Sequence, residues 1–308
     1  MTADKQFDVI TAFDICVDFL MDLGDAEPEF GQKEKLVEGY NLEMGGSACI
    51  FACQCAKLGL ATTGVGSIGE DSFGTFMKEC LSQGGVDTSF LRRTTDKTGL
   101  TLCLTKKGGD RGMLTYMGTI DKVKKHWIEE LLPKTRHLHI CSYYLIKGLQ
   151  TEYPSILKKA KELGVTISLD TNWDPEEGWD SGIRDVLPYV DVFLPNENEL
   201  MYITGQNNIE DALKYAGERV PIIAVKCGEK GAYAYCEGTI YQCDAMKITV
   251  ADTVGAGDSF NGGFLYGFLN KLSMEECLKA GTFCGSMNAS NYGGTKGQPQ
   301  LEQLKQHL

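Results

Sequence analysis

The 308-residue sequence predicts an α/β fold, in which a doubly wound, mainly parallel sheet lies between helices and a small β-sheet lid is inserted near the start of the chain. Short apolar segments rich in β-branched residues alternate with helical patterns along most of the sequence, as a parallel sheet covered on both faces requires. Two early segments interrupt this alternation, and one of them has the two-residue period of a hairpin with a single apolar face.

The alternating elements follow one another in chain order. The first of them are a strand over 8–13, a helix over 47–58 that ends at Gly59, a strand over 62–65 and a helix over 72–81. The later predicted strands are 137–141, 165–169, 190–194 and 221–225, with a helix over 153–163 between the first two. Ligands bind beyond the carboxyl ends of the strands in such sheets, so Asp170-Thr171-Asn172-Trp173 and Pro195-Asn196, which follow strands, are placed for a binding crevice.

The lid is predicted from two segments. Leucines alternate with threonine and cysteine over residues 98–105, and Gly108-Gly109-Asp110 then turns the chain back. Residues 19–41 are rich in glycine and charge and have no helical period. The predicted lid therefore comprises segments of about 18–42 and 96–118, within a single domain spanning residues 1–308.

A simple surface hairpin is the alternative interpretation of the second lid segment. A sheet with one apolar face and no helix over it needs cover, which a second copy of the lid would provide. The sequence thus predicts a homodimer formed through the lid.

The composition restricts the partners of the protein. The chain has 42 acidic and 30 basic residues and a formal net charge of −12, which argues against nucleic acid or an anionic membrane as a partner. A run of about eighteen apolar residues is absent, and the polar start of the chain shows no secretory signal, so we expect a cytoplasmic protein. Twelve cysteines fit this expectation as buried, reduced thiols.

The most informative segment is Asp252-Thr253-Val254-Gly255-Ala256-Gly257-Asp258, which precedes apolar residues at helical spacing. A helix that begins near Gly257 would direct unpaired amides and a positive dipole toward this loop. The small residues would let an anion approach these amides, which suits a phosphate. Asp258 fits beside a phosphate if it takes the proton of a hydroxyl that attacks the phosphorus. Helix capping alone is the alternative explanation of the turn.

This segment resembles the second signature of the ribokinase-like, or PfkB, family of carbohydrate kinases, which reads D-T-x-G-A-G-D-x-F. The resemblance extends from about Phe7 to Gly294, with further motifs in the family's order. These are Gly45-Gly46-Ser47-Ala48, the glycine-rich stretch 64–74, Asn196-Glu197-Asn198-Glu199 as N-x-x-E, and Lys226-Cys227-Gly228-Glu229-Lys230-Gly231 as K-x-G-x-x-G.

The resemblance implies ATP-dependent phosphorylation of a hydroxyl on a small sugar, of the ketohexose or pentose type, by direct in-line transfer. It implies that Asp258 is the base and that the amides of Gly255, Ala256 and Gly257 bind the phosphoryl group. The implied sugar-binding residues are Asp18, Gly45, Gly46, Ser47 and Asn172. The family usually has a substrate-binding asparagine where this chain has Ile50, which predicts a reshaped pocket or a less hydroxylated substrate.

The resemblance also implies a nucleotide site. Its residues are Asn196, Glu199, Lys226, Gly228, Gly231 and Thr253, with Mg²⁺ held by Glu199 through water. The sequence has no G-x-x-x-x-G-K-[ST] loop, so ATP would not be bound in that way. Some relatives bind a monovalent cation such as K⁺, and here Asp252 and the Val254 carbonyl occupy the corresponding positions. From spacing alone, Asn196 and Glu199 fit a capping pair at a helix start equally well.

Two other functions stay open. A nucleoside kinase of the same fold would need an aromatic-lined lid, which Phe19, Phe30 and Tyr116 allow. A non-catalytic sugar or nucleotide sensor would have no use for a base at Asp258. Arg111, in the turn of the hairpin, either reaches over the substrate or is a solvated turn residue.

Overall fold

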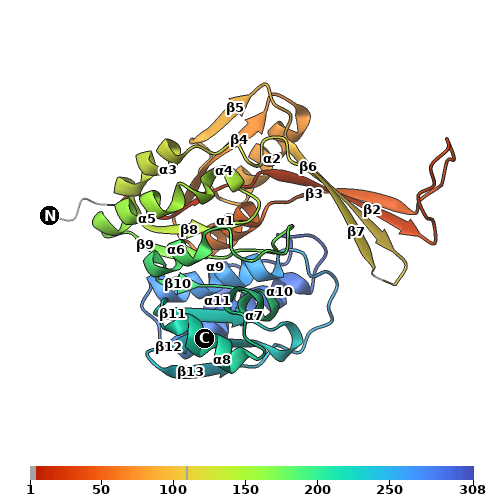
Figure 1. Ribbon diagram of the computed structural model, residues 1–308. Helices are drawn as coiled ribbons and strands as arrows, with labels where there is room; N and C mark the ends of the chain where they lie inside the picture. The colour runs from red at the N-terminus through yellow and green to blue at the C-terminus, as the bar shows by residue number, and fades with distance from the viewer. Residues whose placement is uncertain (1–4, 109) are drawn as a thin grey trace.

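The structure, a computed structural model, describes residues 5–108 and 110–308; Gly109, part of the predicted hairpin turn, lies outside the described residues. Within them, a nine-stranded sheet forms the centre of the molecule (Figure 1). In spatial order its strands are β13 (Thr239–Cys243), β12 (Ala232–Cys236), β11 (Ile222–Lys226), β10 (Val192–Phe193), β9 (Thr166–Leu169), β8 (Thr135–Ile140), β1 (Phe7–Ala12), β4 (Thr62–Gly69) and β5 (Leu91–Thr94). Neighbouring strands are parallel from β11 to β5, and β12 and β13 add an antiparallel hairpin at one edge.

Helices cover both faces of the sheet and enclose two apolar cores. One core packs against α1 (Ser47–Lys57), α2 (Ser72–Gln83), α9 (Ala256–Leu269) and α10 (Met274–Ala289). The other packs against α3 (Lys125–Leu131), α5 (Tyr153–Glu162), α6 (Ile183–Val186), α7 (Glu197–Thr204) and α8 (Ile209–Gly217). The remaining short helices are α4 (Lys147–Gln150), α11 (Leu301–His307) and the 3₁₀ turns η1 (Leu132–Lys134), η2 (Leu187–Tyr189) and η3 (Gly228–Lys230). All eight residues of β4 are buried, as expected for a strand covered on both faces.

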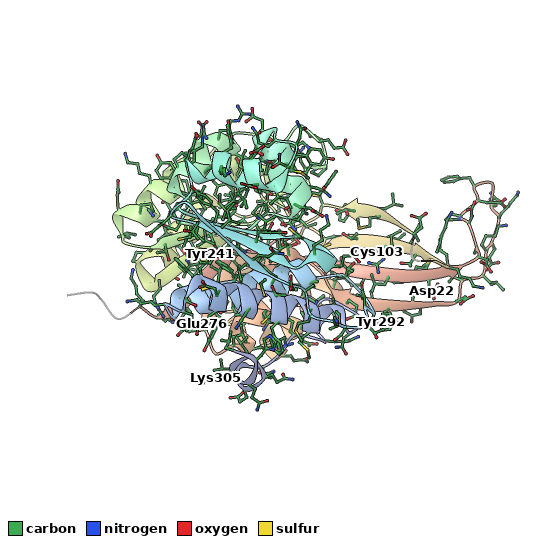
Figure 2. The ribbon with its side chains drawn as sticks, turned by 90° about the horizontal axis from the view of Figure 1, so that it is seen from below. Asp22, Cys103, Tyr241, Glu276, Tyr292 and Lys305 are labelled. Atoms are coloured by element: carbon green, nitrogen blue, oxygen red, sulfur yellow. The ribbon has the colours of Figure 1, made fainter. Side chains whose placement is uncertain are left out.

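A separate four-stranded sheet projects from one side of the molecule and forms the lid (Figure 1). Its strands, in spatial order, are β3 (Gly39–Met44), β2 (Cys16–Gly24), β6 (Gly99–Lys106) and β7 (Arg111–Tyr116). Strand pairing aligns Asp18 on β2 with Glu43 on β3 and Thr101 on β6, so these side chains share one face of the lid. Figure 2 shows Cys103 and Asp22 along the projecting strands and Tyr292, from the segment after α10, beside their root.

The predicted fold class is confirmed, and the predicted strands and helices coincide with observed ones to within a few residues. Strand β5 and the β12–β13 hairpin are additions that the sequence pattern did not predict. Each of the twelve cysteines is a free thiol. Among the described helices, none combines the length and the apolar character that crossing a membrane requires.

Candidate active site

The N-terminus of α9 begins at a glycine that no other residue could replace without strain. Gly255 is the N-cap and has φ +70°, in the left-handed region. A Cβ atom there would lie 2.7 Å from the Gly294 carbonyl oxygen and 2.9 Å from Ile50 Cγ2. The loop therefore packs closely on its neighbours, and the first amides of α9, which have no partners within the helix, remain available to an anion.

Ile50 packs beneath this loop. Its side chain is buried, and a Cβ atom on Gly294 would lie only 2.7 Å from Ile50 Cδ1. Ile50 does not belong to the described residues that line the cavity beside the loop. The aliphatic side chain of Ile50 therefore supports the backbone of Gly255 and Gly294.

A cavity of about 370 Å³ opens above the N-terminus of α9. It lies where β9, β10 and β11 end, which is the crevice predicted for a parallel sheet. The lining residues are Ser47, Asp170, Asn172, Asn196, Glu199, Lys226, Gly228, Gly255, Gly257 and Asp258. The structure thus brings residues from the acceptor motif, the nucleotide motifs and the α9 loop, which are far apart in sequence, around one space.

Asp258 is the carboxylate of this cavity nearest to the start of α9. Only 8% of the residue is exposed. Burial, reinforced by the nearby Asp170 carboxylate, raises the pKa of Asp258 well above its ordinary value, although the Lys226 ammonium opposes this. A carboxyl group with a raised pKa is a better proton acceptor than an exposed aspartate once it is ionised.

Lys226 supplies a positive charge at the same end of the cavity. Its ammonium forms an ion pair with Asp170 and donates to Asn261 Oδ1 at 3.3 Å, while Asn261 donates to Asp170. A Cβ atom on Gly257 would lie 3.7 Å from Lys226 Nζ, so the ammonium is beside the first turn of α9. Burial lowers the pKa of Lys226, but the carboxylates of Asp170 and Glu199 outweigh burial and raise it, so the side chain stays charged.

Asp170 and Asn261 contact Lys226 beside the cavity, although the sequence assigned neither of them a role. Asp170 follows β9 directly, which placed it in the crevice without giving it a role. Asn261 lies on α9, one turn after Asp258, within an otherwise apolar stretch. Together they hold Lys226 in place.

Asn196 and Glu199 form a capping box at the start of α7. Asn196 Oδ1 accepts from the Glu199 amide at 2.9 Å, and Glu199 Oε2 accepts from the Asn196 amide at 2.9 Å. Both side chains also line the cavity, so the pair has a structural role and a position near the site. Burial, together with the Asp170 charge, raises the pKa of Glu199 to about 7.

These oxygens fit Mg²⁺ held mainly by phosphates and water. Among the described residues, no group of three or more histidine, cysteine, aspartate or glutamate side chains is arranged so that it could hold a metal ion. Mg²⁺ keeps several waters and is commonly bound through one or two carboxylates plus substrate phosphates. Glu199 and Asn196 offer such a donor set at the cavity wall.

Asp14 anchors the turn on the acceptor side. Its carboxylate accepts from the amides of Ser47 at 2.9 Å and Ala48 at 3.0 Å, and from the Ser142 hydroxyl at 2.6 Å. Burial raises the pKa of Asp14 to about 6, although these hydrogen bonds oppose it. A Cβ atom on Gly46, which has φ +82°, would lie 2.5 Å from the Asp14 carbonyl oxygen, so only glycine fits there.

Asp18 lies at the base of the lid and faces Gly45. A Cβ atom on Gly45 would lie 2.3 Å from Asp18 Oδ1, so the glycine allows backbone and carboxylate to approach closely. Burial and the carboxylates of Asp14, Glu43 and Asp252 raise the pKa of Asp18 to about 7.

Asn172 joins the acceptor turn to the end of β9. Its backbone has φ +56°, and its side-chain amide donates to the Ser47 hydroxyl at 2.7 Å. Its Oδ1 accepts from the Ser142 amide at 3.0 Å. These bonds hold Ser47 at the cavity wall.

Arg111 reaches from the lid to the α9 loop. Its guanidinium donates to Asp252 Oδ1 at 3.0 Å. Asp252 also accepts from the amides of Val254 at 3.1 Å and Gly293 at 3.2 Å, and the Val254 carbonyl accepts from Asn288 at 2.9 Å. Despite burial, the two amides and Arg111 lower the pKa of Asp252. The two groups suggested for a monovalent cation thus already have protein partners.

The remaining predicted residues differ in position. Gly228 has φ +56° and lines the cavity. Gly231 instead lies against the neighbouring strand, because a Cβ atom there would be 2.0 Å from the Cys243 carbonyl oxygen. Only glycine fits this tight turn. Thr253 is exposed, and its carbonyl accepts from the Ala256 amide at 3.3 Å.

The fold and the site together are those of a small-molecule kinase. The model of the pfkB family of carbohydrate kinases matches residues 10–301, and the chain belongs to this family. Sugar phosphorylation with ATP is therefore supported for the chain as a family activity.

Curated relatives resemble the chain over most of its length. It is 28% identical over 290 residues to the 2-dehydro-3-deoxygluconokinase of Bacillus subtilis, covering 88% of each chain. It is 25% identical over 321 residues to the 5-dehydro-2-deoxygluconokinase of the same species, covering 98% of this chain and 96% of that protein.

Solved structures share the fold. Arabidopsis thaliana ribokinase, solved with ribose and ATP, has a TM-score of 0.84 at 21% identity, with 97% of this chain and 98% of that chain covered. A nucleoside kinase of Methanocaldococcus jannaschii has a TM-score of 0.80 at 20% identity, with 99% of both chains covered. Because these proteins act on different acceptors, the shared fold does not define the acceptor of this chain.

Proposed function

We propose that this carbohydrate kinase transfers the γ-phosphoryl group of ATP to a hydroxyl of a small neutral sugar, of the ketohexose or pentose type, with Asp258 as general base. The observation that supports this most directly is the position of Asp258. Its buried carboxylate shares a cavity with the first turn of α9 and with the Lys226 ammonium. A proton acceptor and a site for phosphate oxygens are what in-line transfer to an alcohol needs.

In this mechanism the acceptor hydroxyl lies between Asp258 and the γ-phosphorus. As the acceptor oxygen forms its bond to phosphorus, its proton moves to the Asp258 carboxylate. The bond from the γ-phosphorus to the bridging oxygen breaks, and ADP leaves. The amides of Gly255, Ala256 and Gly257, with Lys226, stabilise the charge on the transferring group. Asp258 then releases its proton to solvent.

The proposal includes Mg²⁺ on the phosphates, near Glu199 and Asn196. When bound, Mg²⁺ neutralises phosphate charge. Glu199, whose pKa is raised to about 7, ionises more readily when a cation lies nearby. A monovalent cation near Asp252 would have to share that carboxylate with Arg111, which already neutralises it.

The direct test replaces the base. We expect Asp258→Asn to lower the turnover of ADP release by about 10²- to 10⁴-fold while leaving the melting temperature close to that of the wild type. Asp185→Asn, at an exposed carboxylate on α6, is the matched control and should leave turnover unchanged. Retention of more than half of the wild-type turnover by Asp258→Asn would refute the assignment of the base.

The acceptor is identified with a panel of ketoses, pentoses, sugar acids and nucleosides. The lid favours a sugar over a nucleoside, because Phe19 and Tyr40 stack on each other at 5.5 Å on the lid face opposite to Asp18. Tyr116 shares that outer face through its pairing with Leu100. A nucleoside phosphorylated faster than every sugar would contradict the proposal, and binding without ADP release would indicate a sensor.

We also propose that the outer lid face forms a homodimer. Its strands carry exposed apolar side chains, with 67% of Tyr40, 65% of Leu114 and 54% of Tyr116 accessible. An apolar sheet face of this kind is typical of an interface. Light scattering at micromolar concentration should give a dimer, which Leu114→Glu should dissociate and Leu163→Glu, remote from the lid, should not. A monomeric wild type would contradict this proposal.

A further inference from the structure

We infer that Arg111 is a positioning residue that couples the lid to the phosphate-binding loop, so that efficient phosphoryl transfer requires the lid to be closed on Asp252. The inference rests on the proposed function for its kinetic consequence. The contact between Arg111 and Asp252 is independent of the identity of the acceptor.

The register of the lid directs Arg111 toward the site. Arg111 pairs with Thr105 across β6 and β7, and Thr105 pairs with Asp22 on β2. Side chains two residues apart on a strand share a face, so Arg111 lies on the same lid face as Asp18. The guanidinium is therefore on the inner, polar face of the lid.

Asp252 connects Arg111 to the start of α9. Only 5% of Asp252 is exposed, and its two oxygens hold the amides of Val254 and Gly293. Val254 immediately precedes Gly255, whose conformation sets the first turn of α9. A change in the charge balance at Asp252 will thus alter the loop that binds the phosphoryl group.

The buried carboxylate needs the cation that the lid supplies. Asp18 and Glu43 bring further negative charge to the base of the lid, and Asp18 lies close enough to Asp252 for their charges to interact. Removing one partner of a buried ion pair is costly because the other charge is left without compensation. If the lid opens, Asp252 loses its ion pair with Arg111. The Asp252 carboxylate then keeps only its hydrogen bonds from the amides of Val254 and Gly293.

A second ion pair joins the other edge of the lid to the same region. Lys296 Nζ lies 2.6 Å from Glu43 Oε1 on β3, and β3 and β7 are the two edge strands of the lid sheet. Lys296 is largely exposed, so this pair contributes little on its own. The two ion pairs therefore lie at opposite edges of the lid sheet. Of the two, the pair between Arg111 and Asp252 has the more deeply buried carboxylate.

A double-mutant cycle tests the coupling. We expect Arg111→Ala to lower kcat roughly tenfold or more with a smaller effect on the KM for ATP, and Asp252→Asn to have a similar effect. Because both substitutions break the same contact, the double variant should be no slower than the slower single variant. Arg111→Lys, or guanidinium ion added to Arg111→Ala, should restore part of the loss. Lys106→Ala is the matched control, because Lys106 lies on the same hairpin but pairs at 2.6 Å with the exposed Glu27.

A second readout does not depend on turnover. Amide hydrogen exchange of Val254 and Gly293 should accelerate in Arg111→Ala and stay unchanged in Lys106→Ala, because only the first loosens Asp252. Unchanged exchange together with unchanged kcat would overturn the inference. The inference would also be overturned if the effects of Arg111→Ala and Asp252→Asn on kcat multiplied in the double variant. A rise in the KM for the acceptor alone would overturn it as well, because it would show that Arg111 binds the acceptor. If no acceptor is found, the proposed function fails while the exchange result still decides the coupling.

Discussion

The Lys226 ammonium, at the end of β11, and the Asp170 carboxylate, directly after β9, form a buried ion pair in the crevice, although β10 lies between these two strands in the sheet. The pair gives one end of the cavity a fixed cation without adding net charge. Asp170 is shared with Asn261 on α9, so the same contact ties the sheet to the helix that carries Asp258. The position of Lys226, the charge beside Asp258 and the pKa of Asp258 therefore all depend on Asp170.

Replacing Lys226 should reduce catalysis. We expect Lys226→Met to lower kcat by about 10²- to 10³-fold, the range found when a preorganised transition-state donor is removed. Lys226→Arg, which keeps the charge, should lose less. Steady-state kinetics with ATP as the varied substrate provide the measurement, and Lys230→Met, at an exposed lysine paired with Glu197, is the control. A rise in the KM for ATP with kcat unchanged would show that Lys226 binds ground state and transition state equally.

The pH dependence of kcat/KM should follow the charges around Asp258. Asp258 must be ionised to act as a base, so its raised pKa places the acid limb of the profile above the range of an ordinary aspartate. Asp170→Asn removes a like charge and should move this limb to lower pH. Lys226→Met removes the opposing positive charge and should move it to higher pH. Limbs that coincide in the wild type and both variants would mean that another group controls the profile.

The sequence predicted the sheet and the α9 loop because their signals are local. Apolar runs, helical spacing and small residues at a helix start can be recognised within ten residues of chain. The β12–β13 hairpin lacks a clear signal of this kind, because the alanines and tyrosines that alternate in β12 are both apolar residue types, and because β13 is an edge strand without a buried residue. Its position depends on pairing with β11, which is a tertiary effect.

The residues that hold the site together were less predictable. Asp14 takes its hydrogen bonds from Ser47 and Ser142, which are 33 and 128 residues away. Arg111 meets Asp252 across 141 residues. Contacts between residues so far apart in the sequence cannot be recognised from local spacing. In the sequence, a buried carboxylate that accepts several hydrogen bonds cannot be told from a solvated carboxylate in a loop. The motif residues that line the cavity could be predicted by resemblance, whereas the residues that position them required the fold.

Gly255→Ala should damage both stability and catalysis. A residue with a Cβ atom at φ +70° is strained by about 1–2 kcal/mol, and the new atom would also meet the Gly294 carbonyl oxygen at 2.7 Å. We expect a lower melting temperature and a lower kcat, because the loop must shift at the N-terminal end of α9, where we propose that the phosphoryl group binds. Gly39→Ala is the control, since nothing lies within 4 Å of its Cβ position. A Gly255→Ala protein with wild-type kcat would show that the loop geometry is not critical.

Asp18→Asn should make the stability of the free protein less dependent on pH. Burial and neighbouring carboxylates raise the folded-state pKa of Asp18 from its ordinary value of 3.8 to about 7. The folded state therefore binds this proton more tightly than the unfolded state does. The resulting stability is fully present below about pH 4 and is lost as the pH rises through 7, so this carboxylate destabilises the fold at pH 8.

Asn cannot ionise, and each pKa unit corresponds to about 1.4 kcal/mol. Allowing for the partial exposure of Asp18, we expect the substitution to stabilise the protein by about 1–2 kcal/mol at pH 8 and by little at pH 5. Melting curves from pH 5 to pH 8 provide the measurement, with Asp25→Asn, at an exposed lid position, as the control. Part of the slope should persist in Asp18→Asn, because burial also raises the pKa of Asp14 to about 6. Parallel curves for the wild type and Asp18→Asn would show that Asp18 is ionised at little cost in the folded protein, and that the acceptor side of the site tolerates its clustered carboxylates.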